Sequence, residues 1–431
     1  MPLRLILLGM SALSLIYDAL TLHIIDQKRQ EPLPDEVSDV YTKERWETFV
    51  QYKHDSRLPY LIQKGTGFLF EAVFLLSPFY QMIEQLAGGS AVRIVLYTVL
   101  LLTLLPLPVS LVLDWYRIFY IEQKYGLNHR TTGEFLKEQI VDLAGGLILE
   151  LGIYSLLALI LLNLEKWTGG FSVSLPQCIL LMAGIAAVIF VFLLLASLFS
   201  WKMMRVNYTF VPLEDGSLKS KILHLVRDSR RKVRAIEVYN ESKKSTSKNA
   251  FVFKLLFYRS IGIADNFINE NAEEELLAVL SHEAGHLKHK PDVRNFLSWG
   301  LIALLFAAAV AALYYGRTVS GFESLVEASF GLSVMNPVLT VNAAMSLCTP
   351  LLFLIRVFRA YVSRCEEYEA DRNAVKEGYG EELIRTFKTL SNDELIDVNP
   401  ADLIEFLEYD HPGMYHRIAA IRIAMAEGGS I

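Results

Sequence analysis

The sequence predicts a mainly α-helical membrane protein that carries a metal-binding helix and a small β-sheet. Its composition is the first reason, because 53% of the 431 residues are hydrophobic and only 20% are charged. The mean hydropathy of +0.33 is the second, since an ordinary soluble domain is nearer a quarter charged and is not net hydropathic. The third reason is an H-E-x-x-H motif at His282–His286. Together these features favour a bundle of transmembrane helices joined to a metal-binding domain.

Apolar stretches of the length that spans a bilayer recur along the chain. A membrane-spanning helix needs roughly 20 mostly apolar residues. Seven stretches qualify, at about residues 3–25, 66–87, 92–114, 143–163, 175–201, 295–315 and 337–358. The first lacks the basic start and cleavage site of a signal peptide, so we expect a retained span. Pro106, Pro108 and Pro350 predict kinks in the third and seventh spans, which membranes tolerate.

The distribution of basic residues predicts how these spans are oriented. Nine Lys and Arg residues lie between Lys202 and Arg234, after the fifth span. The connections 2–3, 4–5 and 6–7 contain little beyond Lys166 and Arg317. Because basic loops stay on the cytoplasmic side, we expect an outside N-terminus and a cytoplasmic H-E-x-x-H motif.

Two regions follow from this organisation. Residues 1–203 would form a membrane region with five spans, and residues 204–431 a second region with the two spans at about 295–315 and 337–358. Within the second region, Ala235–Tyr239 and Ala250–Phe257 are rich in β-branched and aromatic residues, which predicts a small sheet. From about Glu273 the pattern becomes helical and continues through the metal motif.

Charge and cysteine content exclude two other classes of protein. A formal net charge of −6 gives no electrostatic basis for binding nucleic acid. Cys178, Cys348 and Cys365 are odd in number and widely spaced, so they predict neither a disulfide framework nor a C-x-x-C zinc site. Any metal would therefore be held by histidines and carboxylates.

His282 and His286 are four residues apart and share one face of a helix, so both imidazoles can bind one ion. Glu283 lies about 100° round the same helix. A zinc hydrolase needs this arrangement, because its metal polarises a carbonyl while a carboxylate takes a proton from the attacking water. The alternative is a chance pair of histidines on a solvated helix.

A catalytic zinc ion also needs a third protein ligand. Glu367 and Asp371 are four residues apart in a helical stretch, so one can bind the metal while the other orients a histidine ligand. On spacing alone, a solvated acidic helix face that includes Glu366 and Glu369 stays an open alternative.

Four ordered segments resemble the type I CAAX prenyl proteases and their prokaryotic relatives. Ile121–Asn128 is similar to the family's E-x-K-x-G-x-N segment, and residues 238–253 to the strand before its metal helix. Ser363–Asp371 matches its S-R-x-x-E-[FY]-x-A-D motif, and His411-Pro412 with Arg417 matches its C-terminal H-P…R element. The resemblance covers nearly the whole chain.

This resemblance implies a seven-helix bundle around a chamber and a cytoplasmic zincin-like metalloprotease domain. It implies one zinc ion per chain with Glu367 as the third ligand and Asp371 behind the ligands. Asn249 and Ala250 would lie on a sheet edge that receives the substrate backbone. His411 and Arg417 would approach the scissile carbonyl, alongside the catalytic base Glu283.

The expected function is that of a membrane zinc metalloendopeptidase acting on peptides or proteins, with or without a prenyl group. The residues Ala424–Ile431 contain no dilysine-type retrieval signal. We therefore favour a bacterial or archaeal member in the cell membrane over a eukaryotic member in the endoplasmic reticulum. Two alternatives are a quality-control protease of the heat-shock type and a non-catalytic chamber-forming transporter or scaffold.

Overall fold

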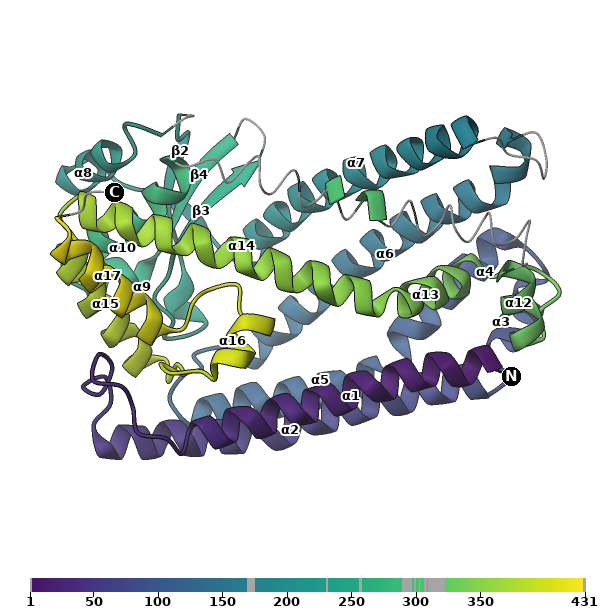
Figure 1. Ribbon diagram of the computed structural model, residues 1–431, viewed down its shortest axis with the longest axis horizontal. Coiled ribbons are helices and arrows are strands. Elements are labelled where there is room, and N and C mark those ends of the chain that lie inside the picture. Colours follow the sequence, from purple (N-terminus) through teal and green to yellow (C-terminus); the bar gives the residue numbers. More distant parts are fainter. Residues whose placement is uncertain are drawn as a thin grey trace.

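The computed structural model describes residues 2–168, 175–229, 232–255, 258–288 and 322–428, together with scattered residues between 297 and 308. The first half is helical: α1 (Pro2–Lys28), α2 (Lys43–Leu76), α3 (Phe79–Ala87), α4 (Ala91–Leu104), α5 (Leu107–Tyr116), the π-helix η1 (Arg117–Glu122), α6 (Thr132–Thr168) and α7 (Leu175–Asn207). Long helices run side by side along most of the molecule, and the sheet lies at one end (Figure 1).

The second half combines short strands with helices. Its elements are β1 (Phe210–Pro212), α8 (Ser217–Leu225), β2 (Ala235–Tyr239), the 3-10 helix η2 (Glu241–Lys243), β3 (Ala250–Leu255), β4 (Tyr258–Ala264), α9 (Asp265–Glu270), α10 (Glu273–Lys288), α12 (Phe322–Phe330), α13 (Pro337–Leu347), α14 (Thr349–Lys376), α15 (Gly380–Asp393), α16 (Asp402–Glu408) and α17 (Met414–Ala426). The long helix α14 connects the helical bundle to the end that contains the sheet (Figure 1).

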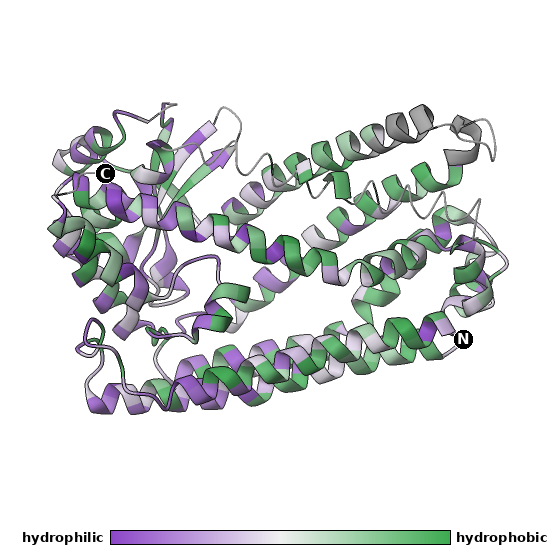
Figure 2. Ribbon diagram, in the orientation of Figure 1, coloured by the Kyte–Doolittle hydropathy of each residue, from purple (hydrophilic) through white to green (hydrophobic). Residues whose placement is uncertain are grey.

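Hydrophobic residues cover the long helices, whereas hydrophilic residues gather at the sheet end (Figure 2). Four described helices are long and apolar enough to cross a membrane: Pro2–Lys28, Ala91–Glu122, Thr132–Asn163 and Ile189–Asn207. Two bent pairs also qualify, α2 with α3 and α13 with α14. The predicted span at 295–315 falls mostly outside the described residues, so the count of seven stays a prediction.

Proline explains where these helices bend. The predicted span 66–87 is not one straight helix, because α2 and α3 meet at 63°. Ser77, just before Pro78, is extended with ψ 174°, as the clash with the proline ring requires. The expected kink at Pro350 is present, since this residue is the second of α14 and follows directly after a 64° bend. Pro106 likewise separates α4 from α5.

The predicted sheet is present and has the order β1-β2-β4-β3. β2 and β4 are parallel, whereas β3 pairs antiparallel with β4 in the register Ala250↔Ile263. β3 is therefore the last strand on one side of the described sheet. Ile236, Ile261 and Ile263 pack from the sheet onto Leu277 and Leu280 of α10, which anchors this helix against the strands.

A second core joins the two halves of the chain. Val37, Val40 and Phe49 from the N-terminal region are buried against Leu383 and Ile418 of α15 and α17. Tyr41 reinforces this contact, because its hydroxyl donates to the carbonyl of Ser391, 350 positions further along the chain. The region boundary at residues 203/204 stays a prediction. The second core contains residues from both sides of this boundary.

Candidate metal centre

The helix α10 carries the H-E-x-x-H motif and packs on two sides. One face is buried beneath the sheet, and the other contacts α14. Three glutamates in its first turn, Glu273–Glu275, suit the positive end of the helix dipole. Leu276, Leu280 and Leu287 are buried in the core beneath the sheet. The opposite side of the helix packs against α14, which brings His282 and His286 to face that helix.

Gly285 lets α10 and α14 approach closely. A Cβ atom at this position would lie 2.7 Å from the Cα atom of Ala370, which is closer than real side chains come. The side-chain amide of Asn373 donates to the carbonyl oxygen of Ser281 at 2.7 Å and fixes the relative position of the two helices. The second variable position of the motif is therefore set by helix packing.

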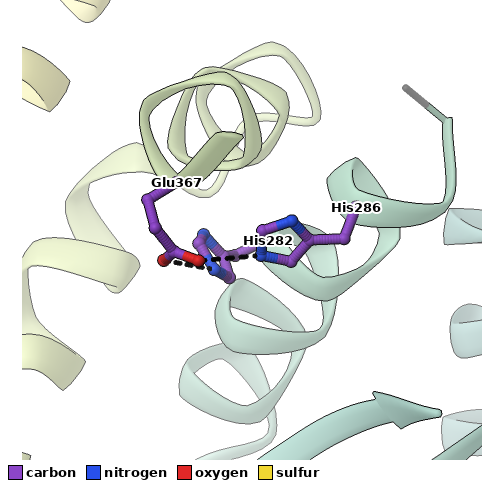
Figure 3. A group of neighbouring side chains, drawn as sticks. All are labelled: His282, His286 and Glu367. Carbon is purple, nitrogen blue, oxygen red and sulfur yellow. Dashed lines mark ion pairs between the residues drawn. The ribbon is translucent and has the colours of Figure 1, made fainter. Parts of the chain in front are cut away.

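His282, His286 and Glu367 form a compact group between the two helices (Figure 3). Their potential ligand atoms lie within 4.8 Å of one another. The Nε2 atom of His282 is 3.4 Å from Glu367 Oε2, and that of His286 is 3.2 Å from Glu367 Oε1. Among the residues that the structure describes, none donates a hydrogen bond to the buried Oε2 atom of Glu367. Such an atom fits a metal ion, and two imidazoles with one carboxylate suit zinc.

Asp371 and Arg417 lie behind His282. Asp371 Oδ1 is 2.8 Å from the Nδ1 atom of His282, which fixes the orientation of the imidazole. Burial would lower the pKa of His282, but the hydrogen bond to Asp371 and the nearby Glu367 carboxylate outweigh it and raise the pKa to about 9. The raised pKa favours the protonated ring, with which a metal ion would compete.

Arg417 lies deeper than the sequence suggested. Its Nε and Nη2 atoms donate to the two carboxylate oxygens of Asp371, at 3.0 and 2.7 Å, and Nη1 is 3.4 Å from Glu367 Oε2. Burial would lower the pKa of Arg417, but the charge of Asp371 raises it. The side chain is only 9% exposed, so its expected contact with the scissile carbonyl stays a prediction.

The other two predicted catalytic side chains are more accessible. The His411 ring is 59% exposed, with its Nε2 atom 3.5 Å from Glu367 Oε1, and its Nδ1 atom is 2.9 Å from the Asp410 carboxylate. Glu283 is half-buried on α10. In the described part of the chain it makes no hydrogen bond or ion pair, and this leaves its carboxylate available to a water molecule.

The strand β3 leaves one row of backbone groups unpaired within the described sheet. The carbonyl of Asn249 accepts the N–H of Ala264 at 2.9 Å, so Asn249 faces β4. Because backbone groups alternate between the two sides of an antiparallel strand, the N–H and C=O of Ala250 point away from β4. The geometry therefore gives Ala250 the open hydrogen-bonding groups of an edge strand.

Sequence reasoning missed Arg364, which is buried on α14 one turn before Glu367. Its guanidinium donates to the carbonyls of Glu405 and Phe406 at 2.9 and 3.3 Å, and to that of Tyr409. These contacts hold the end of α16, from which the chain continues to His411. The signal was present, because Arg364 belongs to the S-R-x-x-E motif, but its carbonyl partners are about 40 positions away.

Comparison with known proteins matches almost the whole chain. Residues 23–203 match the family model of the CAAX prenyl protease N-terminal region with five membrane helices, and residues 212–424 match peptidase family M48. CAAX prenyl protease 1 of Saccharomyces cerevisiae is 29% identical over 333 residues, which cover 74% of this chain and 70% of that protein. A CAAX prenyl protease 1 homolog of Arabidopsis thaliana is 24% identical over 90% of each chain.

Two further comparisons concern the fold and the source. The crystal structure of S. mikatae Ste24p has a TM-score of 0.79 at 24% identity, covering 98% of this chain and 99% of that one, so the two share a fold. A metalloprotease of Bacillus subtilis is 25% identical over 74% of this chain and 71% of its own length. The favoured prokaryotic source is not borne out, because the other relatives named here are eukaryotic.

Proposed function

This chain belongs to peptidase family M48 as a multi-pass membrane metalloprotease, and we propose that it is a zinc endopeptidase acting on the cytoplasmic side of its membrane. The observation that carries the proposal is the convergence of His282, His286 and Glu367 between α10 and α14. These three residues would hold one zinc ion per chain. When bound there, zinc would supply a Lewis acid for the scissile carbonyl and lower the pKa of water.

The side chains around this site would transfer the proton of the attacking water and stabilise the negative charge on the carbonyl oxygen. Glu283 would take a proton from the attacking water and return it to the leaving amine. His411 would donate a hydrogen bond to the carbonyl oxygen as negative charge develops, which is worth a few kcal/mol in comparable enzymes. Arg417 would add positive charge beside Glu367 and hold Asp371 against His282.

The edge of the sheet would hold the substrate. Ala250 would pair its outward N–H and C=O with the backbone of an extended peptide, in the β-augmentation mode. Asn249 would add a side-chain contact at the start of the same strand. The unpaired edge of β3 supports this assignment, since it leaves main-chain donors and acceptors for a further strand.

Metal content and turnover together test the proposal. Purified protein should contain about one zinc per chain, and replacing His282, His286 or Glu367 by Ala should deplete it. Glu283→Gln keeps the shape of the side chain but removes the base, so zinc should stay while turnover falls by several orders of magnitude. Stoichiometric zinc in the Glu367→Ala protein, or near-normal turnover of Glu283→Gln, would reject the assignment.

The substrate class is a peptide or protein. The relatives named CAAX prenyl proteases support a substrate with a prenylated cysteine close to its C-terminus, followed by the residues that would be removed. Two fluorogenic CAAX-type peptides that differ only in a farnesyl group would test this point. A higher kcat/KM for the farnesylated peptide is the expected result, and equal values would remove the prenyl group from the determinants of recognition.

A further inference from the structure

The segment that leads into β3 is held by a carboxylate from a distant part of the chain. Glu394 follows α15, and its Oε1 atom accepts the backbone N–H of Lys248 at 3.0 Å and the hydroxyl of Ser247 at 3.1 Å. The neighbouring Asp393 carboxylate lies 3.2 Å from the Lys248 ammonium group. Two consecutive acidic residues therefore bind the two residues immediately before Asn249.

The same segment is anchored from its other side. The side-chain amide of Asn266 donates to the carbonyl of Ser247 at 2.8 Å. Earlier in the same segment, the carbonyl oxygen of Lys244 accepts the backbone N–H of His129 at 3.0 Å, and Ser245 forms a β-bridge with Asn128. These contacts fix the approach to β3, whereas Glu394 fixes the last two residues before the strand.

The turn that carries Glu394 has an unusual backbone. Leu395 has a φ of 53°, which is rare for a residue with a side chain, and it is fully buried. Such a conformation persists only where the surrounding structure holds it. The buried leucine side chain packs into the second core, so the turn cannot shift without disturbing that core.

The N-terminal region supplies the remaining support for this turn. The Tyr41 hydroxyl lies 2.6 Å from the carbonyl oxygen of Ile396 and 2.7 Å from that of Ser391, so its one proton is shared between the two. Arg45, in the first turn of α2, donates to the carbonyls of Asn392 and Asp393 at 2.8 and 2.9 Å. The turn is therefore fixed by residues that lie between α1 and the first turn of α2 in the sequence.

We propose that Glu394 is a positioning residue for substrate binding. It holds Ser247 and Lys248 so that Asn249 and Ala250 present a fixed edge to the substrate backbone, and Tyr41 and Arg45 extend this control to the N-terminal region. This inference rests on the proposed function of the β3 edge. A pre-ordered edge favours binding because less conformational entropy is lost when the peptide pairs with it.

Three variants separate positioning from general stability. Glu394→Ala removes the acceptor of both hydrogen bonds, whereas Glu394→Gln keeps a carbonyl oxygen in the same place. Glu381→Ala alters an exposed glutamate at the opposite end of α15 and serves as the control. Three quantities are measured on each variant. They are the steady-state kinetics with the farnesylated fluorogenic peptide, the zinc content, and the backbone hydrogen exchange over residues 247–250.

For Glu394→Ala we expect KM to rise about tenfold, as for the loss of a charge-assisted hydrogen bond, with full zinc content and kcat within about threefold of the wild type. Hydrogen exchange over residues 247–250 should be faster. Glu394→Gln should restore most of the affinity, and Glu381→Ala should match the wild type. A Glu394→Ala protein with wild-type KM would overturn the inference, as would a Gln variant as impaired as the Ala variant.

Failure of the proposed function gives a different result. If the wild-type protein holds zinc but cleaves neither peptide, the protease assignment to this edge fails. Hydrogen exchange then still tests whether Glu394 orders the segment, and unchanged exchange in Glu394→Ala would overturn the positioning role independently.

Discussion

At the scale of single residues, Gly285 sets the separation of the two helices that form the metal centre. Because a Cβ atom there would lie 2.7 Å from the Cα atom of Ala370, Gly285→Ala should push α10 away from α14. We expect a loss of about 1–3 kcal/mol in unfolding free energy and weaker zinc retention. Gly146→Ala is the matched control, since no atom lies within 4 Å of its added Cβ. Equal melting temperatures and zinc contents would contradict this prediction.

His416 provides a pH-dependent contribution to stability. Its Nδ1 atom is 2.8 Å from Glu405 Oε2, and this hydrogen bond raises the pKa of His416 in the folded protein. A raised folded pKa stabilises the fold fully below the unfolded value of about 6.5 and loses its effect as pH rises through the folded pKa. The difference in melting temperature between wild type and His416→Gln should therefore shrink as the pH rises above about 6.5. A difference independent of pH would remove His416 from this role.

The metal ligands on α10 are predictable from sequence because helical spacing is local. Positions four apart share a face, and this determines how His282 and His286 are presented. The partners of Arg417 are not local, because Asp371 lies 46 positions earlier. No helical period connects those positions, so the depth of Arg417 emerges only from the packing of α17 on α14.

At the scale of secondary-structure elements, composition located the sheet but not all of its strands. The segment Ala235–Tyr239 is strand β2, and Ala250–Leu255 lies within the second predicted segment. β4 was not predicted, because Tyr258–Ala264 follows β3 after only two residues and no Gly, Pro, Asn or Asp marks a turn between them. Helix bounds also differ, since α2 extends from Lys43 through a polar stretch that hydropathy does not assign to a span.

The β3 edge gives the sharpest test at this scale. Ala250→Pro removes an N–H that points away from β4, and proline is tolerated at such an edge position. The protein should fold and keep its zinc, but kcat/KM should fall roughly tenfold or more because the substrate loses a backbone partner. In Phe251→Pro the lost N–H points towards β4, so this control should unfold or lose zinc. Wild-type kcat/KM in a folded Ala250→Pro protein would refute pairing at this edge.

At the scale of the whole molecule, the catalytic end depends on both halves of the chain. Val37, Val40 and Phe49 complete the core around α15 and α17. This arrangement was not predictable from sequence, because hydropathy identifies apolar segments but not which distant segment they contact. The bundle of apolar helices was predictable, since its signal lies within each helix.

The charge of the connections predicts the orientation of the whole protein in its membrane. The α3–α4 turn and the helix α8 lie at opposite ends of the long axis (Figure 1). Basic residues gather around α8, from Lys202 to Arg234, whereas the turn at Gly88–Ser90 carries none. Since basic segments stay in the cytoplasm, α8 and the metal centre should be cytoplasmic.

Single cysteines test this orientation directly. In a background with the three native cysteines replaced by serine, Ser90→Cys should react with an impermeant maleimide on intact cells, because it lies in the α3–α4 turn. Ser217→Cys, at the exposed start of α8, should react only after the membrane is permeabilised. Labelling after detergent solubilisation controls for accessibility, since both thiols should then react. The reverse pattern on intact cells would place the metal centre outside and overturn the orientation inferred from charge.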